Sequence, residues 1–241
     1  MKSATYYIKW FGDAEATARY SVVSNWIRKN RGREVLNILD VGGGWRSIYP
    51  EIYKLVDKGF VNLTSVDVDF EDKKMFTKVN YTKLMPGDKL PFKDNSFDLV
   101  FSLDAFEHVF PKQRKSFMTE LLRVCAKDCI LSFPTGKYSF ALDKELYNFS
   151  KEYSKEVHRF FKEHLENGLP DITDYHILFK KEGFSLVEEL PKHSLYFRRI
   201  FMKLWIVKPL LYKIFSPLIL ITYLFFNFGK CYRTYYFFKK V

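Results

Sequence analysis

Cysteine is scarce in this sequence, which has three in 241 residues: Cys125, Cys129 and Cys231. Three unevenly spaced thiols are too few for a disulfide framework or for a closed zinc site, which needs four ligands. We therefore expect free thiols in a reduced, cytoplasmic setting, and no metal site.

Long apolar runs are also missing. The longest uncharged stretch, residues 214–229, has sixteen residues, whereas a helix needs roughly 20 to cross a bilayer core. We expect it to form a buried helix or to lie on a membrane surface. Residues 1–10 show no apolar segment behind a basic start, so no secretory signal is expected.

Acidic residues are absent from the last fifth of the chain. Residues 191–241 carry ten Lys or Arg, no Asp or Glu and fifteen aromatic residues, whereas the other 190 residues carry 29 basic and 28 acidic groups. The net charge of +11 is therefore concentrated at one end of the sequence. Such a basic segment attracts anionic surfaces, either lipid headgroups or nucleic acid.

Strand-like runs alternate with helical patterns through the first half of the chain. Short apolar or β-rich runs predict strands at 35–41, 61–68, 97–103 and 129–133. Helical spacing is found at 13–31, from the glycine turn to about 58, and at 112–124. This alternation predicts an α/β fold with a parallel sheet covered by helices on both faces.

The second half predicts further elements, with helices at 147–167 and 172–181 and strands at 184–190 and 232–239. We interpret 1–241 as a single domain. Its expected parts are an N-terminal helical cap (1–34), a cofactor-binding core (35–136), a helical acceptor-side region with a late strand (137–200), and a basic aromatic helical segment with a final strand (201–241).

A glycine turn follows the first predicted strand. Gly42, Gly43 and Gly44 let the backbone approach a ligand at the edge where open α/β sheets bind cofactors. Asp67 lies 23 residues beyond Gly44, close to the roughly 20-residue offset of a ribose-binding acid. A dinucleotide oxidoreductase would show the same two signals, but its G-x-G-x-x-G fingerprint is met only in part, because the last position is Ser47.

Four segments, in a fixed order along the chain, indicate which class of cofactor the sequence fits. Residues 87–100 (GDKLPFKDNSFDLV) closely resemble a run found in class I S-adenosylmethionine-dependent methyltransferases of the type 11-like, small-molecule and quinone methyltransferase group. Segments 39–44 (LDVGGG), 105–109 (AFEHV) and 121–134 resemble further motifs of that family, in the expected order. The resemblance implies a Rossmann-like fold with a mostly parallel seven-stranded sheet, helices on both faces, and S-adenosyl-L-methionine as cofactor.

The resemblance also implies a set of cofactor-binding positions: Asp40, Gly42, Gly43, Gly44, Asp67, Val68, Asp88, Lys89, Leu90, Ser102 and Leu103. By this resemblance Asp40 and the glycines hold the methionine portion, Asp67 accepts both ribose hydroxyls, and Asp88 meets the adenine amino group. The chain departs from the family pattern in two places. Arg46 occupies the position of the usual third glycine, and the loop after Asp88 is about two residues shorter.

His108 is the candidate catalytic residue, because it follows the fourth predicted strand, near the expected position of the methyl group. It would act as a general base if the acceptor must lose a proton. The alternative is that Glu107 and His108 only open the next helix. His158 and His164, on a charged helix, are expected to be solvated.

The sequence therefore predicts methyl transfer to a small-molecule, lipid-linked or glycan-linked acceptor by positioned in-line displacement. An RNA methyltransferase is an alternative prompted by the charge, although no appended RNA-binding module is visible. A non-catalytic methyltransferase-like binding protein is a second alternative. Residues 191–241 are expected to dock on an anionic membrane. The alternative is that residues 210–228 pack as a helical cover over the acceptor pocket.

Overall fold

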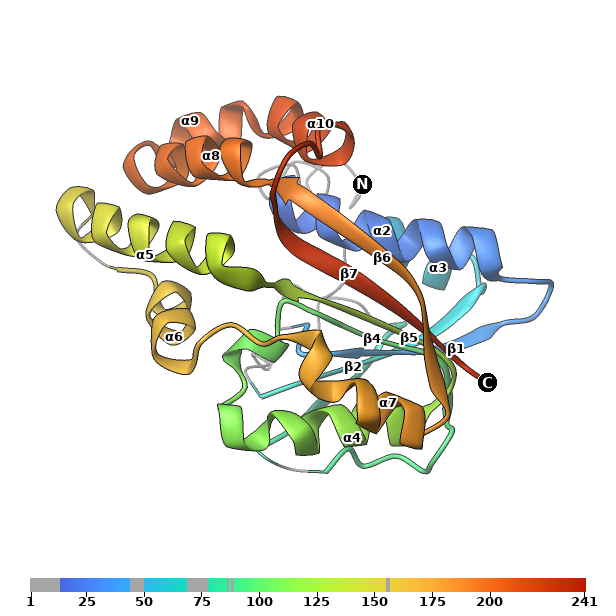
Figure 1. Cartoon of the computed structure of the whole chain (residues 1–241). Helices are drawn as coiled ribbons and strands as arrows, with labels where there is room; N and C mark the ends of the chain where they lie inside the picture. Colours follow the sequence, from blue (N-terminus) through green and yellow to red (C-terminus); the bar gives the residue numbers. More distant parts are fainter. Residues whose placement is uncertain (1–13, 44–49, 69–77, 86, 88, 155–156) are drawn as a thin grey trace.

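The computed structural model describes residues 14–43, 50–68, 78–85, 87, 89–154 and 157–241, which form one sheet flanked by helices (Figure 1). Two of the predicted cofactor-binding residues, Gly44 and Asp88, lie outside the described residues, as does Arg46.

The sheet has seven strands in the order β3-β2-β1-β4-β5-β7-β6. Their bounds are β1 Leu36–Val41, β2 Val61–Asp67, β3 Asn80–Lys83, β4 Phe97–Leu103, β5 Cys125–Pro134, β6 Phe184–Ser194 and β7 Cys231–Lys240. Strands β1 to β5 pair in parallel, whereas β7 runs antiparallel between β5 and β6. The expected mostly parallel seven-stranded sheet is confirmed.

Helices connect and cover these strands. The α-helices are α2 Ala14–Asn30, α3 Pro50–Asp57, α4 Arg114–Val124, α5 Gly136–Tyr153, α6 Arg159–Asn167, α7 His176–Lys181, α8 Leu195–Val207, α9 Pro209–Ile214 and α10 Ser216–Phe225. Among the described residues there are also short 3-10 turns: η2 Phe106–His108, η3 Pro111–Gln113 and η4 Ile172–Tyr175. The helix expected over 147–167 is instead two helices, because α5 ends at Tyr153 and α6 begins at Arg159.

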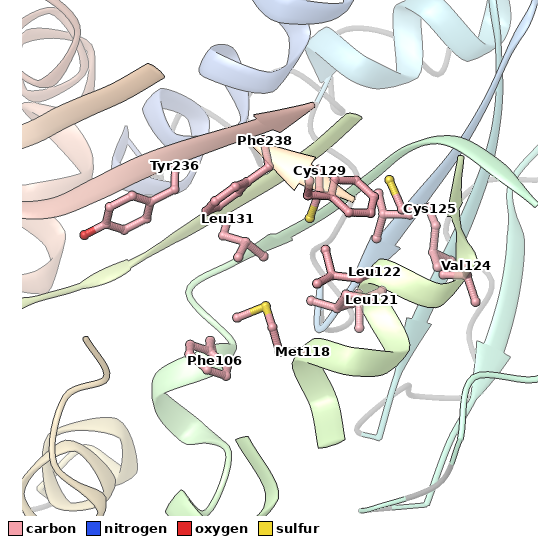
Figure 2. Packing of buried hydrophobic residues seen from close by; sticks show 14 of the residues in the cluster. Phe106, Met118, Leu121, Leu122, Val124, Cys125, Cys129, Leu131, Tyr236 and Phe238 are labelled. Carbon is pink, nitrogen blue, oxygen red and sulfur yellow. The ribbon is translucent and has the colours of Figure 1, made fainter. Parts of the chain in front are cut away.

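The alternation of side chains along the strands builds a core on each face of the sheet. Ile38 and Leu39 are neighbours in β1 and both fully buried, yet Ile38 packs with α2 and α3 while Leu39 packs with α4 and α7. Figure 2 shows this second core, where Met118, Leu121 and Leu122 of α4 point toward β5 and β7. Because both faces are covered, the central strands read as continuous apolar runs.

A buried ion cluster fixes α2 over the carboxyl edge of the sheet. Glu15 of α2 pairs with Arg198 of α8 and Arg233 of β7, and Arg233 also pairs with Asp104 after β4. Arg19 of α2 donates to Asp104 at 2.7 Å. Burial alone would raise the pKa of Glu15, but the guanidiniums of Arg198 and Arg233 hold it far below its usual range. The cluster thus joins α2, α8, β7 and the segment after β4.

Candidate active site

The carboxyl ends of β1, β2 and β4 bring together several predicted cofactor residues. β1 lies between β2 and β4, and its register sets Val41 opposite Val66 and Asp40 opposite Phe101. Asp40, Asp67 and Ser102 therefore share one edge of the sheet. This is the edge at which open α/β sheets bind ligands.

Asp40 is completely buried at this edge. Its Oδ2 accepts a hydrogen bond from the Tyr20 hydroxyl of α2 at 3.2 Å, and its Oδ1 has no partner among the described residues. Burial raises the pKa of this carboxyl well above its usual range, and the nearby charge of Asp67 adds to the effect. A buried oxygen without a partner is costly unless a ligand donates to it.

Gly42, directly after β1, lies so close to the segment after β4 that there is no space for a side chain. Its φ of +79° lies in the left-handed region, and a Cβ added there would sit 2.3 Å from the Cβ of Ala105. No side chain fits in that space. Nearby, Ser102 Oγ is buried without a hydrogen-bond partner among the described residues. At this edge, the backbone of Gly42 can therefore approach a ligand closely, and the Ser102 hydroxyl of β4 is available to bond to it.

The other described cofactor residues differ in exposure. Asp67 is half-buried at the end of β2 and Val68 is exposed, so both reach the rim of the edge. Lys89 is exposed, whereas the Leu90 side chain packs into the core with α4. The Leu90 backbone is held by the Glu120 carboxylate, which accepts from its N–H at 2.9 Å. Gly43 is half-buried and Leu103 is buried in the core beside α2 and α3.

His108 is fixed by a carboxylate from a distant helix. It ends η2, directly after β4, and its Nδ1 lies 2.6 Å from Oε2 of Glu163 on α6. Burial lowers the pKa of His108, but the hydrogen bond with Glu163 and the charge of Glu107 outweigh it, so the net shift is upward. The same hydrogen bond lowers the pKa of Glu163 to about 2.

His164 was expected to be solvated, and that prediction is wrong. The side chain is 4% exposed, because α6 packs against η2 and α5. Its Nδ1 lies 2.8 Å from Oδ2 of Asp143, and Asp143 also accepts from the Tyr232 hydroxyl at 2.8 Å. His158, by contrast, is exposed and its ring lies 4.2 Å from that of Trp205.

Glu107 belongs to the same cluster. Its side chain is 2% exposed, and its Oε1 lies 3.9 Å from Nε2 of His164. The sequence predicts for Glu107 only a helix-opening role, because nothing in the local pattern shows that η2 turns this carboxylate inward.

Arg114 connects the end of η2 to the end of α6. It donates to the carbonyls of Val109 at 3.1 Å and Gly168 at 2.6 Å.

Comparison with known proteins identifies one domain in the chain. A family model described as "Methyltransferase domain" matches residues 39–133, which run from β1 to β5 and include the carboxyl ends of β1, β2 and β4. No curated protein matches the chain in sequence.

Several solved structures share the fold. A magnesium protoporphyrin IX methyltransferase from Synechocystis with bound S-adenosylhomocysteine gives a TM-score of 0.58 at 12% identity, with coverage of 95% of this chain and 84% of the other. A putative sarcosine dimethylglycine methyltransferase from Galdieria sulphuraria gives 0.53 at 14% identity (94% and 84%). A cyclopropane synthase from Mycobacterium tuberculosis gives 0.54 at 15% identity (92% and 84%).

The sheet order is that of the class I methyltransferase fold. Residues 39–133 match a methyltransferase domain, and the described sheet around them has the fold of solved methyltransferases.

Proposed function

We propose that the chain transfers a methyl group from S-adenosylmethionine to a small amphiphilic acceptor. The observation that carries the donor part is the grouping of Asp40, Gly42 and Ser102 at one sheet edge, each with an unused hydrogen-bonding atom or reserved space. Methyl transfer from a sulfonium is an in-line displacement, so its rate depends mainly on how donor and acceptor are positioned.

In this proposal Asp40 and the turn at Gly42–Gly44 hold the methionine end, and Ser102 and Leu103 line the sulfonium. Asp67 takes the ribose hydroxyls at the rim, and Val68 packs on adenine. Asp88, Lys89 and Leu90 complete the adenine end. The Leu90 backbone is held between Glu120 and Arg123, so it can position this loop rigidly.

Asp67→Ala should weaken the binding of S-adenosylhomocysteine by about 1–3 kcal/mol, because ribose hydroxyls lose a charged acceptor. This corresponds to roughly 5- to 150-fold in Kd. Isothermal titration calorimetry measures it directly. Asp57→Ala is the matched control, because Asp57 is an exposed acid that pairs with Lys78 on the surface. Tight NADH binding without any response to S-adenosylhomocysteine would overturn the donor assignment.

A second surface, on α9 and α10, suggests what kind of acceptor the chain methylates. Figure 1 shows α8, α9 and α10 stacked at one end of the molecule, beyond α5. Along α9 and α10, exposed apolar side chains recur at three- and four-residue spacing and form what we call the apolar face: Leu210, Leu211, Ile214, Phe215, Leu218, Ile221 and Phe225. An exposed patch of this kind marks an interaction surface.

Charge selects the partner of the apolar face. Lys208 and Lys213 are exposed beside it, and residues 191–241 contain no acidic residue. Among the described residues no helix is long and apolar enough to cross a membrane. We therefore propose that this face docks on an anionic lipid surface, so that an amphiphilic acceptor enters from the membrane.

Docking should appear as co-sedimentation with vesicles that increases with phosphatidylserine content and falls as salt screens the charges. Leu218→Asp should reduce binding at least about tenfold, because burial of one leucine contributes about 1.5–3 kcal/mol. Ile177→Asp is the matched control, because Ile177 is also highly exposed but lies on α7. A full-length chain that stays in the supernatant with anionic vesicles at low salt would show that the face is not a membrane surface.

Labelled methyl transfer separates this proposal from the two alternatives. The enzyme should label a lipid extract and not total RNA. Label in RNA would instead favour an RNA methyltransferase, and cofactor binding without transfer to either would favour a non-catalytic protein.

A further inference from the structure

Three metal-ligating side chains converge beside the end of β4. One oxygen of Glu107 and one ring nitrogen of each of His108 and His164 all lie within 4.8 Å of one another. The two imidazole centroids are 5.0 Å apart. Two nitrogens and one carboxylate oxygen, with no thiolate, suit first-row divalent transition metals.

The surroundings of the two histidines match those of metal ligands. Each imidazole has its Nδ1 beside a carboxylate, at 2.6 Å for His108 with Glu163 and at 2.8 Å for His164 with Asp143. Metal-bound histidines almost always donate one ring N–H to such a carboxylate, which fixes the tautomer and leaves the lone pair of Nε2 for the metal. Asp143 is fixed in turn by the Tyr232 hydroxyl.

Two atoms of these side chains also lack hydrogen-bond partners among the described residues. Glu107 Oε2 and His164 Nε2 are buried and make no hydrogen bond to any described residue. Buried polar atoms without partners are costly, and a cation would satisfy both at once. The carboxylates of Glu107, Asp143 and Glu163 give the cluster negative charge, which a cation would offset.

We propose that Glu107, His108 and His164 bind one divalent first-row transition metal ion, with at least one coordination position open. The segment η2 begins shortly after β4, and the carboxyl end of β4 belongs to the proposed methyl-transfer site. A metal ion there would bind an oxygen of the acceptor and lower the pKa of that hydroxyl group. That use rests on the proposed function, but metal binding itself does not.

Cobalt(II) is the probe, because its d–d absorption reports ligand number and type. The tag-free, chelator-treated full chain should take up about one Co²⁺ with a visible spectrum, and Zn²⁺ should displace it. Glu107→Gln, His164→Asn and His108→Gln should each weaken uptake at least about tenfold. His176→Gln, on an exposed histidine of α7, and Cys231→Ser should leave the titration unchanged.

Binding of S-adenosylhomocysteine to the same samples reports folding and separates the two proposals. His108→Gln is the key variant, since His108 is about a third exposed at its side chain and the change is expected to leave the fold intact. Wild type that binds S-adenosylhomocysteine but gives no cobalt spectrum overturns the metal site and leaves the donor proposal standing. A spectrum that persists in His108→Gln overturns it as well.

Discussion

Replacing His108 by alanine should lower methyl transfer by about 10²- to 10⁴-fold and leave the affinity for S-adenosylhomocysteine nearly unchanged. The reason is its proposed role beside the methyl-transfer site: His108 ends η2, after β4, and its Nδ1 is held by Glu163. Loss of the imidazole removes the group that promotes loss of the acceptor's proton, either as a base or as a metal ligand. The proposed cofactor residues at the carboxyl ends of β1, β2 and β4 are expected to keep their positions, because the His108 side chain bonds to Glu163 of α6.

Transfer of labelled methyl groups into a lipid extract measures the rate, and calorimetry measures cofactor affinity. His176→Ala serves as the control, because His176 is exposed on α7 and outside the cluster. Equal transfer by wild type and His108→Ala would eliminate any role of His108 in the reaction.

Glu15→Gln should lower the free energy of unfolding by about 3–5 kcal/mol, the usual cost of breaking a buried ion pair. Glu15 is shared by two guanidiniums, Arg198 and Arg233, whose side chains are 4% and 1% exposed. The amide removes the charge and keeps the shape, so Arg198 loses its buried anionic partner. Urea unfolding measures the change through the midpoint at constant m.

Glu145→Gln is a closely matched control, because Glu145 also bridges two cations of α8, Arg199 and Lys203, but at the surface. It should cost less than about 1 kcal/mol. Similar decreases in the free energy of unfolding for both variants would show that the buried ion pairs of Glu15 stabilise the fold no more than surface ion pairs do.

The pH dependence gives a second readout for Glu15. Its folded pKa is depressed below the ordinary value of 4.5, so its stabilisation is complete above that pH and is lost as the pH falls. The difference between wild type and Glu15→Gln should therefore be constant at neutral pH and shrink below about pH 4.5. A difference that grows on acidification would contradict this assignment.

The central strands and the place of the proposed cofactor residues at their carboxyl ends could be predicted from sequence because the signals are local. β1 and β4 are buried on both faces, so they read as apolar runs; Gly42 directly follows β1, and Asp67 is the last residue of β2. β3 could not be predicted, because it is a four-residue, mostly polar edge strand, Asn80–Lys83. The described donor residues fall where the resemblance placed them along the chain, and their roles stay predictions.

The histidine cluster could not be predicted, because its members come from separate elements. Glu163 lies 55 residues from His108, and Tyr232 lies 89 from Asp143. The break between α5 and α6 turns His164 inward, and a continuous charged helix gives no sign of that break. The expectation of no metal site rested on the number of cysteines and on the sequence spacing of the histidines. Neither shows which histidines and carboxylates tertiary packing brings together.

The position of β7 has a consequence for how the chain is made. β7 lies between β5 and β6, so β6 has no hydrogen-bonded neighbour in the sheet until β7 has left the ribosome. At elongation rates of about 5–20 residues per second, the interval between synthesis of β6 and synthesis of β7 is on the order of seconds. During that time β6 and the helix α8 lack their contacts with β7. During this interval the nascent chain exposes an unpaired strand and an uncovered apolar layer, both prone to aggregation. Translation speed over residues 195–240 is therefore expected to affect the fraction of chains that reach the native state.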